Sequence, residues 1–329
     1  MATRKQSWRI GAAQKGVRLD HFLAEALPKA LGHEVSRAQV RRLIVSGLVS
    51  RNGRREQMAS YELREGTWVE VFLDPAKFGP GTAAGGRQAP PREFTWTADR
   101  ILFEDEWLIV VDKPAGLPTQ PTLDAARANV FGALKAFLAR RDGGEPYLAL
   151  QHRLDLDTSG VLLFTRDQRA NAGTTALFAE KLAQKTYLAL ATGGAAGPES
   201  WSVEDHLGVV GRVGRVSKFG AVRSGGDPAQ TSFRLLERLH GGWLVEAQPH
   251  TGRTHQIRVH LAGGGNPIFG DELYGGPSQL RTARGEWRPV PRVLLHAARL
   301  EFPHPVTKTT IEVRSAVPAD FAGCVEALR

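Results

Sequence analysis

Two short segments near the start of the chain carry apolar residues at helical spacing. The first segment begins at Val17 and places apolar side chains at Leu19, Phe22, Leu23 and Leu27. The second begins at Ser36, a residue type that caps helices, and its buried face is marked by Val40, Leu43 and Ile44. Residues 47–53 then predict a short strand that ends in an Asn-Gly turn, and alternation over 68–72 predicts another strand. Residues 17–74 therefore predict a small domain of helices and short strands.

The stretches on either side of this small domain have little apolar surface to bury. Residues 1–16 are polar and basic, so we expect a basic N-terminal arm there. Residues 75–97 are rich in proline, glycine and alanine, a composition that predicts an interdomain linker.

The remainder of the chain, 98–329, alternates short apolar strands with a few helices. Strands are expected at 107–111, 161–164, 187–191, 231–236, 243–248 and 299–302. Helices are expected at 129–140 and 168–180, and another from about residue 254. Many short strands with glycine-rich turns and few helices predict an α+β fold with a mixed, mainly antiparallel sheet. Residues 275–292 are expected to form a basic loop insertion.

The composition of the chain is that of a globular protein attracted to polyanions. Its 329 residues suggest one large domain or two unequal ones, with enough chain to bury a sizeable core. A formal charge of +9 favours nucleic acid as a partner, although charge alone does not establish RNA binding. No apolar run reaches the roughly eighteen residues of a membrane span, and the N-terminus lacks the apolar core of a signal peptide. We therefore expect a cytoplasmic protein that meets no membrane, and a monomer.

The densest polar cluster of the chain lies at 152–160, where the sequence reads HRLDLDTSG directly before an apolar strand. Burying such groups costs free energy unless they find partners, so a functional site is one interpretation. A polar turn whose side chains cap and pair with one another fits the same composition. The residues alone leave both interpretations open.

A second cluster, TGRTHQIRVHL, lies at 251–261. Ile257 and Leu261 are four residues apart and mark the buried side of a helix, and Arg258 lies next to that face and can reach inward. An amphipathic helix whose arginine and histidine side chains are solvated fits the same pattern. The spacing predicts the helix but does not decide its function.

Signatures of cofactors and metals are missing from the sequence. His255 and His260 are five residues apart and do not share a helical face as a zinc-binding pair does, and the one cysteine, Cys324, cannot form a multi-cysteine site. No GxxxxGK[ST] phosphate loop is present, and no GxGxxG signature follows a strand. Ser159 stands in TSG rather than in a GxSxG elbow, which disfavours a serine hydrolase. We expect neither a metal nor a small-molecule cofactor.

Taken together, these clusters resemble the RluA-type pseudouridine synthases. The HRLDxxTSG pattern of that family matches 152–160 and its TGRTHQIRVHL pattern matches 251–261. Weaker motifs follow the family's order at 110–116, 185–187, 267–271 and 294–297, and the resemblance covers roughly 101 to 317. Residues 17–73 separately resemble the ribosomal-protein-S-four-like (αL) RNA-binding domain. The resemblance implies a pseudouridine synthase fold for 98–329 and RNA as the partner.

The resemblance also implies a catalytic set. Isomerising uridine changes no oxidation state, so the reaction needs no cofactor. The essential aspartate of the family corresponds to Asp155, which acts either as a nucleophile or as a base toward the sugar. Arg258 is expected against Asp155, where a guanidinium can hold the carboxylate bidentately. Tyr187 corresponds to the family's active-site tyrosine, whose ring stacks on uracil and whose hydroxyl can assist proton transfer.

Contacts to RNA are expected from further residues. A target uridine must leave its stack to reach Asp155, and Arg153 is expected to fill the vacated space, although a plain phosphate contact is the alternative. Contacts to the flipped base and its strand are also expected from His152, Arg253 and His255. Phosphates of folded RNA are expected on a basic ridge of the small domain formed by Arg37, Arg41 and Arg42. A solvated helix face explains that ridge equally well.

The resemblance favours large-subunit ribosomal RNA as the substrate and leaves transfer RNA as an alternative. A non-catalytic RNA-binding or ribosome-assembly protein on the same scaffold is the main competing hypothesis. It is disfavoured because Asp155, Tyr187 and Arg258 are all present. A glycoside hydrolase using Asp155 and Asp157 needs carboxylates about 5–10 Å apart across a sugar, and residues two apart in a turn are poorly placed for that.

Overall fold

A computed structural model of the chain describes residues 4–32, 35, 40, 43–44, 48–56, 58–73, 94–122, 127–213 and 216–329. The chain divides into two compact units, Met1–Arg92 and Glu93–Arg329, each taken by itself below. Most of the predicted second helix lies outside the described residues, as does the linker up to residue 93. The same holds for the basic ridge of Arg37, Arg41 and Arg42.

The small unit is a four-stranded antiparallel sheet with a helix, α1 (Leu19–Leu31). The strand order is β1-β4-β2-β3, with bounds Arg4–Arg9 for β1, Val49–Arg51 for β2, Arg54–Arg55 for β3 and Trp68–Leu73 for β4. The predicted apolar positions of both helices are buried in one core, which contains Leu19, Leu23, Leu27, Val40, Leu43 and Ile44. Asn52 and Gly53 turn the β2–β3 hairpin with φ of 48° and 77°, as the Asn-Gly pair predicts.

The N-terminal segment differs from the expected basic arm. Residues 4–9 form β1, which pairs with β4 from Arg4↔Leu73 to Arg9↔Trp68. Trp8 packs edge-on against Phe22 of α1, with ring centroids 6.0 Å apart. An edge strand is held mainly by backbone hydrogen bonds and one apolar contact, so its polar composition concealed it.

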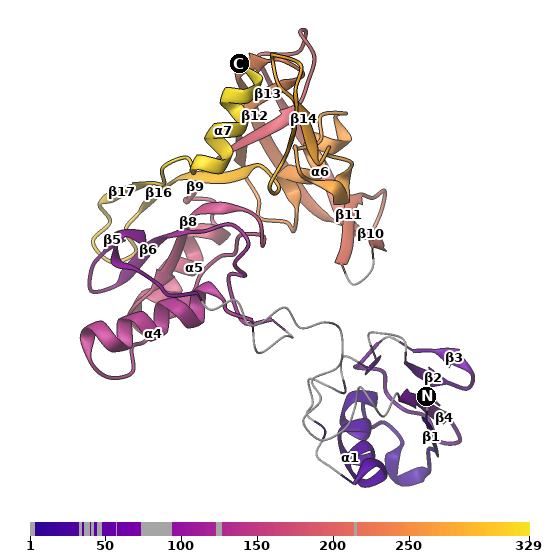
Figure 1. The fold of residues 1–329 in the computed structure, drawn as a ribbon. Coiled ribbons are helices and arrows are strands. Elements are labelled where there is room, and N and C mark those ends of the chain that lie inside the picture. The colour runs from indigo at the N-terminus through magenta and orange to yellow at the C-terminus, as the bar shows by residue number, and fades with distance from the viewer. Residues whose placement is uncertain are drawn as a thin grey trace. The chain divides into compact units, whose positions relative to one another are not determined.

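The large unit is built on one eleven-stranded sheet (Figure 1). The strand order is β11-β10-β12-β13-β9-β16-β8-β6-β5, with β17 paired to β16 and β7 paired to β8. Among the strand pairs within the described residues of this unit, only β16–β8 is parallel. The strand bounds are Ile101–Glu104 (β5), Leu108–Lys113 (β6), Ala149–Leu150 (β7), Ser159–Thr165 (β8), Gln184–Thr192 (β9), Ser200–Val213 (β10), Val216–Ala221 (β11), Asp227–Leu239 (β12), Gly242–Pro249 (β13), Leu295–Pro303 (β16) and Thr310–Arg314 (β17). The predicted mixed, mainly antiparallel sheet is therefore confirmed.

Four helices within the described part of this unit cover the sheet. They are α4 (Val130–Asp142), α5 (Asn171–Ala179), α6 (Gln256–Gly263) and α7 (Ala319–Leu328), with short 3₁₀ turns at η2 (Ala98–Arg100), η3 (Gln168–Ala170) and η4 (Glu272–Tyr274). Asn129 caps α4 by accepting a hydrogen bond from the Gly132 N–H at 2.9 Å. The predicted helices at 129–140, at 168–180 and from about 254 are thus found within a few residues of their expected bounds.

Strands β6 and β8 are buried on both faces, which explains their unbroken apolar sequences. On one face, Ile109 and Phe164 share a core with Leu134 of α4. On the other face, Val110 and Leu163 share a second core with Leu177 of α5. Figure 1 shows α4 at the β5-β6-β8 end of the sheet and α7 beside β12 and β13.

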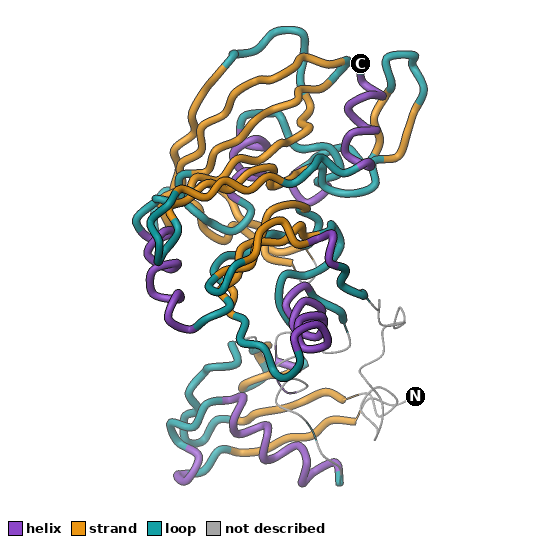
Figure 2. Tube along the Cα trace, turned by 90° about the vertical axis from the view of Figure 1, so that its left-hand side faces the viewer, coloured by secondary structure: helices purple, strands orange, loops and turns teal. Residues whose placement is uncertain are grey.

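The predicted loop insertion at 275–292 contains a hairpin, β14 (Gln279–Arg281) with β15 (Trp287–Pro289). Figure 2 shows this hairpin standing beside α7, and the Ala283 N–H donates to the Ala327 carbonyl at 3.0 Å. Leu280 anchors it, since that side chain is buried. The long hairpin of β10 and β11 was not predicted either, because glycines and charged residues interrupt the alternation of its apolar residues.

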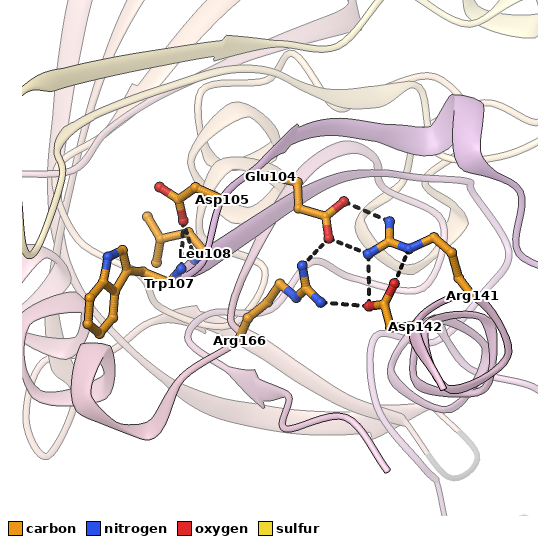
Figure 3. Close-up of polar contacts among 7 residues, drawn as sticks. All are labelled: Glu104, Asp105, Trp107, Leu108, Arg141, Asp142 and Arg166. Carbon is orange, nitrogen blue, oxygen red and sulfur yellow. Dashed lines mark hydrogen bonds and ion pairs between the residues drawn. The ribbon is translucent and has the colours of Figure 1, made fainter. Parts of the chain in front are cut away.

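An ion-pair network ties α4 to β5 and β8 at the edge of the large unit (Figure 3). Arg141 donates to both carboxylate oxygens of Glu104 at 2.8 and 2.6 Å, and to Asp142. Arg166 donates to Asp142 at 2.7 Å and also to Glu104. Asp105 caps the neighbouring β5–β6 turn. These charges lie outside both sequence clusters and hold the frame of the sheet.

Candidate active site

A cavity of about 1400 Å³ opens in the large unit where the two sequence clusters meet. It is lined by the loop before β8, the start of β9, the end of β13 and the start of α6. Every site residue predicted for this unit lines it, namely His152, Arg153, Asp155, Tyr187, Arg253, His255 and Arg258. The fold thus brings together side chains that are up to about a hundred positions apart in the sequence.

The loop that carries Asp155 is held from beneath by a buried ammonium group. Lys113, at the end of β6, is fully buried and donates to the carbonyls of Leu156 at 2.9 Å and Thr158 at 2.7 Å. Its third donor reaches the Pro114 carbonyl at 3.0 Å. Burial lowers the pKa of Lys113 to about 7, against the pull of nearby carboxylates. The sequence showed a lysine in a family motif but not this contact.

The end of the same loop requires a glycine. Gly160 has φ of +112°, and a Cβ there would lie 2.1 Å from the Ala297 carbonyl oxygen. Strand β8 begins at this point, running parallel to β16 with Gly160 opposite Ala297. The close backbone approach fixes where the loop ends and therefore where Asp155 stands.

Arg258 is the cation that faces Asp155. It lies on α6, is 8% exposed, and donates from Nη1 to the Asp155 Oδ2 at 3.1 Å. Its bidentate partner is a different carboxylate, Asp271, which accepts from Nε at 2.7 Å and from Nη2 at 2.8 Å. Burial opposes the charge of Arg258, but the two carboxylates outweigh it and raise the pKa of the guanidinium.

We expected Arg258 to bind Asp155 bidentately, but the structure shows a single hydrogen bond between them. Asp271 is 1% exposed and takes the fork of the guanidinium, because its two carboxylate oxygens accept separately from Nε and Nη2. Sequence reasoning noted the segment 267–271 as a weak motif but gave Asp271 no part in the site. Of the N–H groups of Arg258 that do not bind Asp271, one on Nη1 orients Asp155.

Tyr187 stands on β9 between β13 and β16, opposite Ala247 and Ala297. Its side chain is buried, and burial together with the charge of Asp155 raises the pKa of its phenol well above the ordinary value. The hydroxyl is therefore protonated at neutral pH. The aromatic ring is available as one wall of the cavity.

His152 is half-buried and its ring is neutral. Its Nε2 accepts a hydrogen bond from the Leu163 N–H at 3.0 Å, and the ring lies 4.9 Å from that of Phe178. Burial, aided by the charge of Lys185, lowers the pKa of His152 to about 3. This geometry favours a structural role at β8 over the RNA contact expected for His152.

The other predicted RNA contacts differ in their surroundings. Arg153 is exposed and forms no ion pair within the part of the chain that the structure describes. Arg253 is exposed and donates to the Pro228 carbonyl at 3.1 Å. His255 is half-buried and caps the start of α6, with Nε2 at 3.8 Å from the Asp155 Oδ2.

The described residues contain no cluster of three or more His, Cys, Asp or Glu side chains able to hold a metal ion. His260, the second histidine of the cluster, instead faces the Thr231 hydroxyl at 2.9 Å. Within the same described ranges, no helix is long and apolar enough to cross a membrane.

Comparisons with known proteins define the class. The family model of RNA pseudouridylate synthase matches residues 107–263, and the S4 domain model matches residues 17–69. Over 331 residues the chain is 32% identical to ribosomal large subunit pseudouridine synthase C of Vibrio vulnificus (strain CMCP6), covering 99% of this chain and 98% of that relative. The chain therefore belongs to the RNA pseudouridylate synthase family, and its N-terminal unit contains an S4 domain.

Other relatives carry related names. The chain is 34% identical over 328 residues to ribosomal large subunit pseudouridine synthase D of Xanthomonas campestris pv. campestris, covering 95% of this chain and 89% of that relative. Among solved structures it is similar to human RNA pseudouridylate synthase domain containing 4, at a TM-score of 0.57 and 26% identity over 70% of this chain and 93% of that one. The predicted fold, enzyme class and RNA partner are confirmed by these relations.

Proposed function

We propose that this pseudouridine synthase isomerises uridines of large-subunit ribosomal RNA, with Asp155 as its essential carboxylate. The ribosomal target is supported by the names of the relatives, which cover nearly the whole chain. The role of Asp155 is supported by one observation above all. It lines the cavity within 3.1 Å of a buried arginine that is itself locked to a second carboxylate.

The reaction is an exchange of one glycosidic bond for another. The bond from ribose C1′ to uracil N1 breaks, the bond from C1′ to C5 forms, C5 loses a proton, and N1 gains one. The Asp155 carboxylate either attacks C1′ or removes a proton from the sugar, and both routes require it to be ionised. Arg258 keeps it ionised and oriented through the Nη1 hydrogen bond.

Tyr187 acts on the base in this proposal. Its ring stacks on the flipped uracil and holds it in the cavity while the base turns from N1 to C5. Its protonated hydroxyl, buried near Asp155, takes part in moving the proton that leaves C5. The proposed enzyme acts as a monomer without a cofactor, since isomerisation changes no oxidation state, and its ribosomal substrate places it in the cytoplasm.

Access to the cavity requires the uridine to leave its stack, at a cost of about a few kcal/mol. Arg153 is the proposed residue that fills the vacated space, because it is exposed at the cavity with its donors free of ion pairs among the described residues. Arg253 contributes charge at the same rim. Phosphates of the folded RNA are proposed to bind the S4 unit, through Arg37, Arg41 and Arg42.

The test is the Asp155→Asn variant, which keeps the size of the side chain and removes its charge. Tritium release from RNA labelled at uracil C5 is expected to vanish, while RNA affinity stays within about threefold of wild type. Retained activity would overturn the role of Asp155. If the wild-type protein binds ribosomal RNA without releasing tritium, the non-catalytic assembly function holds instead, and activity confined to transfer RNA transcripts would replace the substrate.

A further inference from the structure

A chain of three contacts leads from the β10–β11 hairpin to the catalytic carboxylate. The Phe219 N–H on β11 donates to the Tyr274 hydroxyl oxygen at 3.0 Å. That oxygen lies 2.8 Å from Nδ1 of His255. On the far side of the ring, Nε2 of His255 lies 3.8 Å from Oδ2 of Asp155. Neither Tyr274 nor the ring of His255 has a part in the mechanism above.

Counting hydrogens along this chain of contacts favours one tautomer of His255. A phenol has one hydrogen to donate, and its oxygen already accepts from the Phe219 N–H. Within the described residues, Nδ1 of His255 is the acceptor that the Tyr274 hydroxyl contacts. The arrangement that uses the phenol hydrogen within the described residues gives it to Nδ1, and the proton of the neutral imidazole is then on Nε2.

The charges around the ring favour the same arrangement. In the Nε2–H tautomer the hydrogen faces a carboxylate, whereas the other tautomer would place a lone pair against it. Burial lowers the pKa of His255, opposed by Asp155 and Asp271 and assisted by Arg258, so the ring is neutral near pH 7. Burial also raises the pKa of Tyr274, whose ring lies 5.1 Å from the Arg258 guanidinium and 5.7 Å from the Lys218 ammonium. The phenol thus remains a donor.

We infer that His255 is a positioning residue whose Nε2–H, set by Tyr274, faces Oδ2 of Asp155 beside the Arg258 hydrogen bond and leaves Oδ1 to react. This inference rests on the proposed role of Asp155. Both contacts, the 3.1 Å hydrogen bond from Arg258 and the 3.8 Å approach of His255, are to Oδ2. In the part of the chain that the structure describes, Oδ1 accepts no hydrogen bond from a side chain. The carboxylate is thereby given one held and one reactive oxygen.

The backbone of His255 adds an independent observation. Its φ of 58° and ψ of 19° lie in the left-handed region, which a non-glycine residue adopts at a cost of about 1 kcal/mol or more. Asparagine adopts this region more readily than histidine. Strain of this kind persists where the surroundings hold the side chain, and here the side chain is held between Tyr274 and Asp155.

The first experiment reads the tautomer directly in the full-length protein. Long-range ¹H–¹⁵N spectra of ¹⁵N-histidine-labelled protein at pH 7 are expected to show a protonated Nε2 and an unprotonated Nδ1 for His255. The signal is assigned by its loss in His255→Gln. In Tyr274→Phe, which removes only the hydroxyl, the His255 signals are expected to shift toward a mixture of tautomers. A protonated Nδ1 in wild type, or an unchanged spectrum in Tyr274→Phe, would overturn the inference.

The second experiment compares two replacements of His255. One suits the left-handed backbone better, and the other places its N–H donor better. Gln places an amide N–H near the position of Nε2, whereas Asn reaches only the position of Nδ1 but suits the left-handed backbone better. We expect His255→Gln to keep a kcat about tenfold or more above that of His255→Asn, with both unfolding at similar denaturant midpoints. Equal activities, or a more active Asn variant, would reduce His255 to a helix cap. Neither result depends on Asp155→Asn, which tests the proposed function separately.

Discussion

The floor and the rim of the cavity are built from the same residue types in opposite ways. The floor consists of Arg258, which lines the cavity, together with the buried groups behind the lining, namely Asp271, which accepts the guanidinium fork, and Lys113, which donates to three carbonyls. The rim consists of exposed arginines, Arg153 and Arg253, with few contacts to the protein. Two guanidinium groups of one cavity therefore perform different tasks.

The difference follows from what each region must do. A carboxylate that reacts at one sugar carbon has to be held in place before the substrate arrives, which requires buried partners with fixed geometry. A surface that receives many RNA sequences needs charge without fixed geometry, which exposed side chains supply. His152 and Arg153 show both demands in adjacent positions, since the first ring is hydrogen-bonded to β8 and the second side chain is exposed at the cavity.

Removing the bidentate partner of Arg258 is expected to have the largest effect on stability and kcat. In Asp271→Ala, the buried Arg258 loses its bidentate partner, and removing one member of a buried ion pair costs about 3–5 kcal/mol. We expect the free energy of unfolding to fall by about 3 kcal/mol and kcat to fall by about 100-fold or more. Denaturant unfolding and tritium release measure the two quantities.

The matched control for Asp271→Ala is Asp167→Ala. Asp167 also binds an arginine through two side-chain hydrogen bonds, to Arg169 at 3.0 and 2.7 Å, but that arginine is 74% exposed. An exposed pair contributes about 0–1 kcal/mol, and the N-cap hydrogen bond that Asp167 also accepts from the Arg169 N–H contributes about 0.5–2 kcal/mol, so kcat should remain near wild type and stability should fall less than in Asp271→Ala. Equal losses in the two variants would show that the floor is no more constrained than the surface.

Acid is expected to destabilise the folded protein through His152. The pKa of His152 is about 3 in the folded protein, below the ordinary 6.5. Between these values the unfolded chain binds a proton at His152 that the folded protein does not. The contribution of His152 to the free energy of unfolding is therefore fully present above pH 6.5 and is lost as the pH falls toward 3. The loss amounts to about 1.4 kcal/mol per pH unit.

The variant that isolates this effect is His152→Gln. Its side-chain oxygen can accept the Leu163 N–H in place of Nε2, but it does not titrate. We expect the stability difference between wild type and His152→Gln to move against wild type as the pH falls from 6.5 to 4.5. If the stabilities of wild type and His152→Gln changed in parallel over that pH range, the ring would be solvated. His152 would then be assigned to the RNA-contacting rim, as first expected.

The sequence was sufficient to predict the sheet, its main strands and the pairing of Asp155 with Arg258, because apolar runs and family motifs are local signals. It did not identify Asp271 as the bidentate partner, since two carboxylates compete for one guanidinium and only the tertiary geometry decides between them. The sequence did not predict the role of Lys113 either, because two of its acceptors are backbone carbonyls more than forty residues away along the chain. Motifs give residue types, whereas packing assigns their partners.

Weakening the rim is expected to have the smallest effect, and one that depends on salt. Arg153→Ala removes an exposed charge from the cavity without leaving a buried group unpaired, so the free energy of unfolding should change by less than about 0.5 kcal/mol. If Arg153 contacts a phosphate, RNA affinity should fall about evenly across sequences, and the slope of log K against log salt should decrease by about 1. If it fills the space of the flipped base instead, the salt slope should hold while kcat falls. Binding isotherms from 50 to 200 mM salt, paired with single-turnover tritium release, separate these outcomes, and an effect on neither would remove Arg153 from the RNA interface.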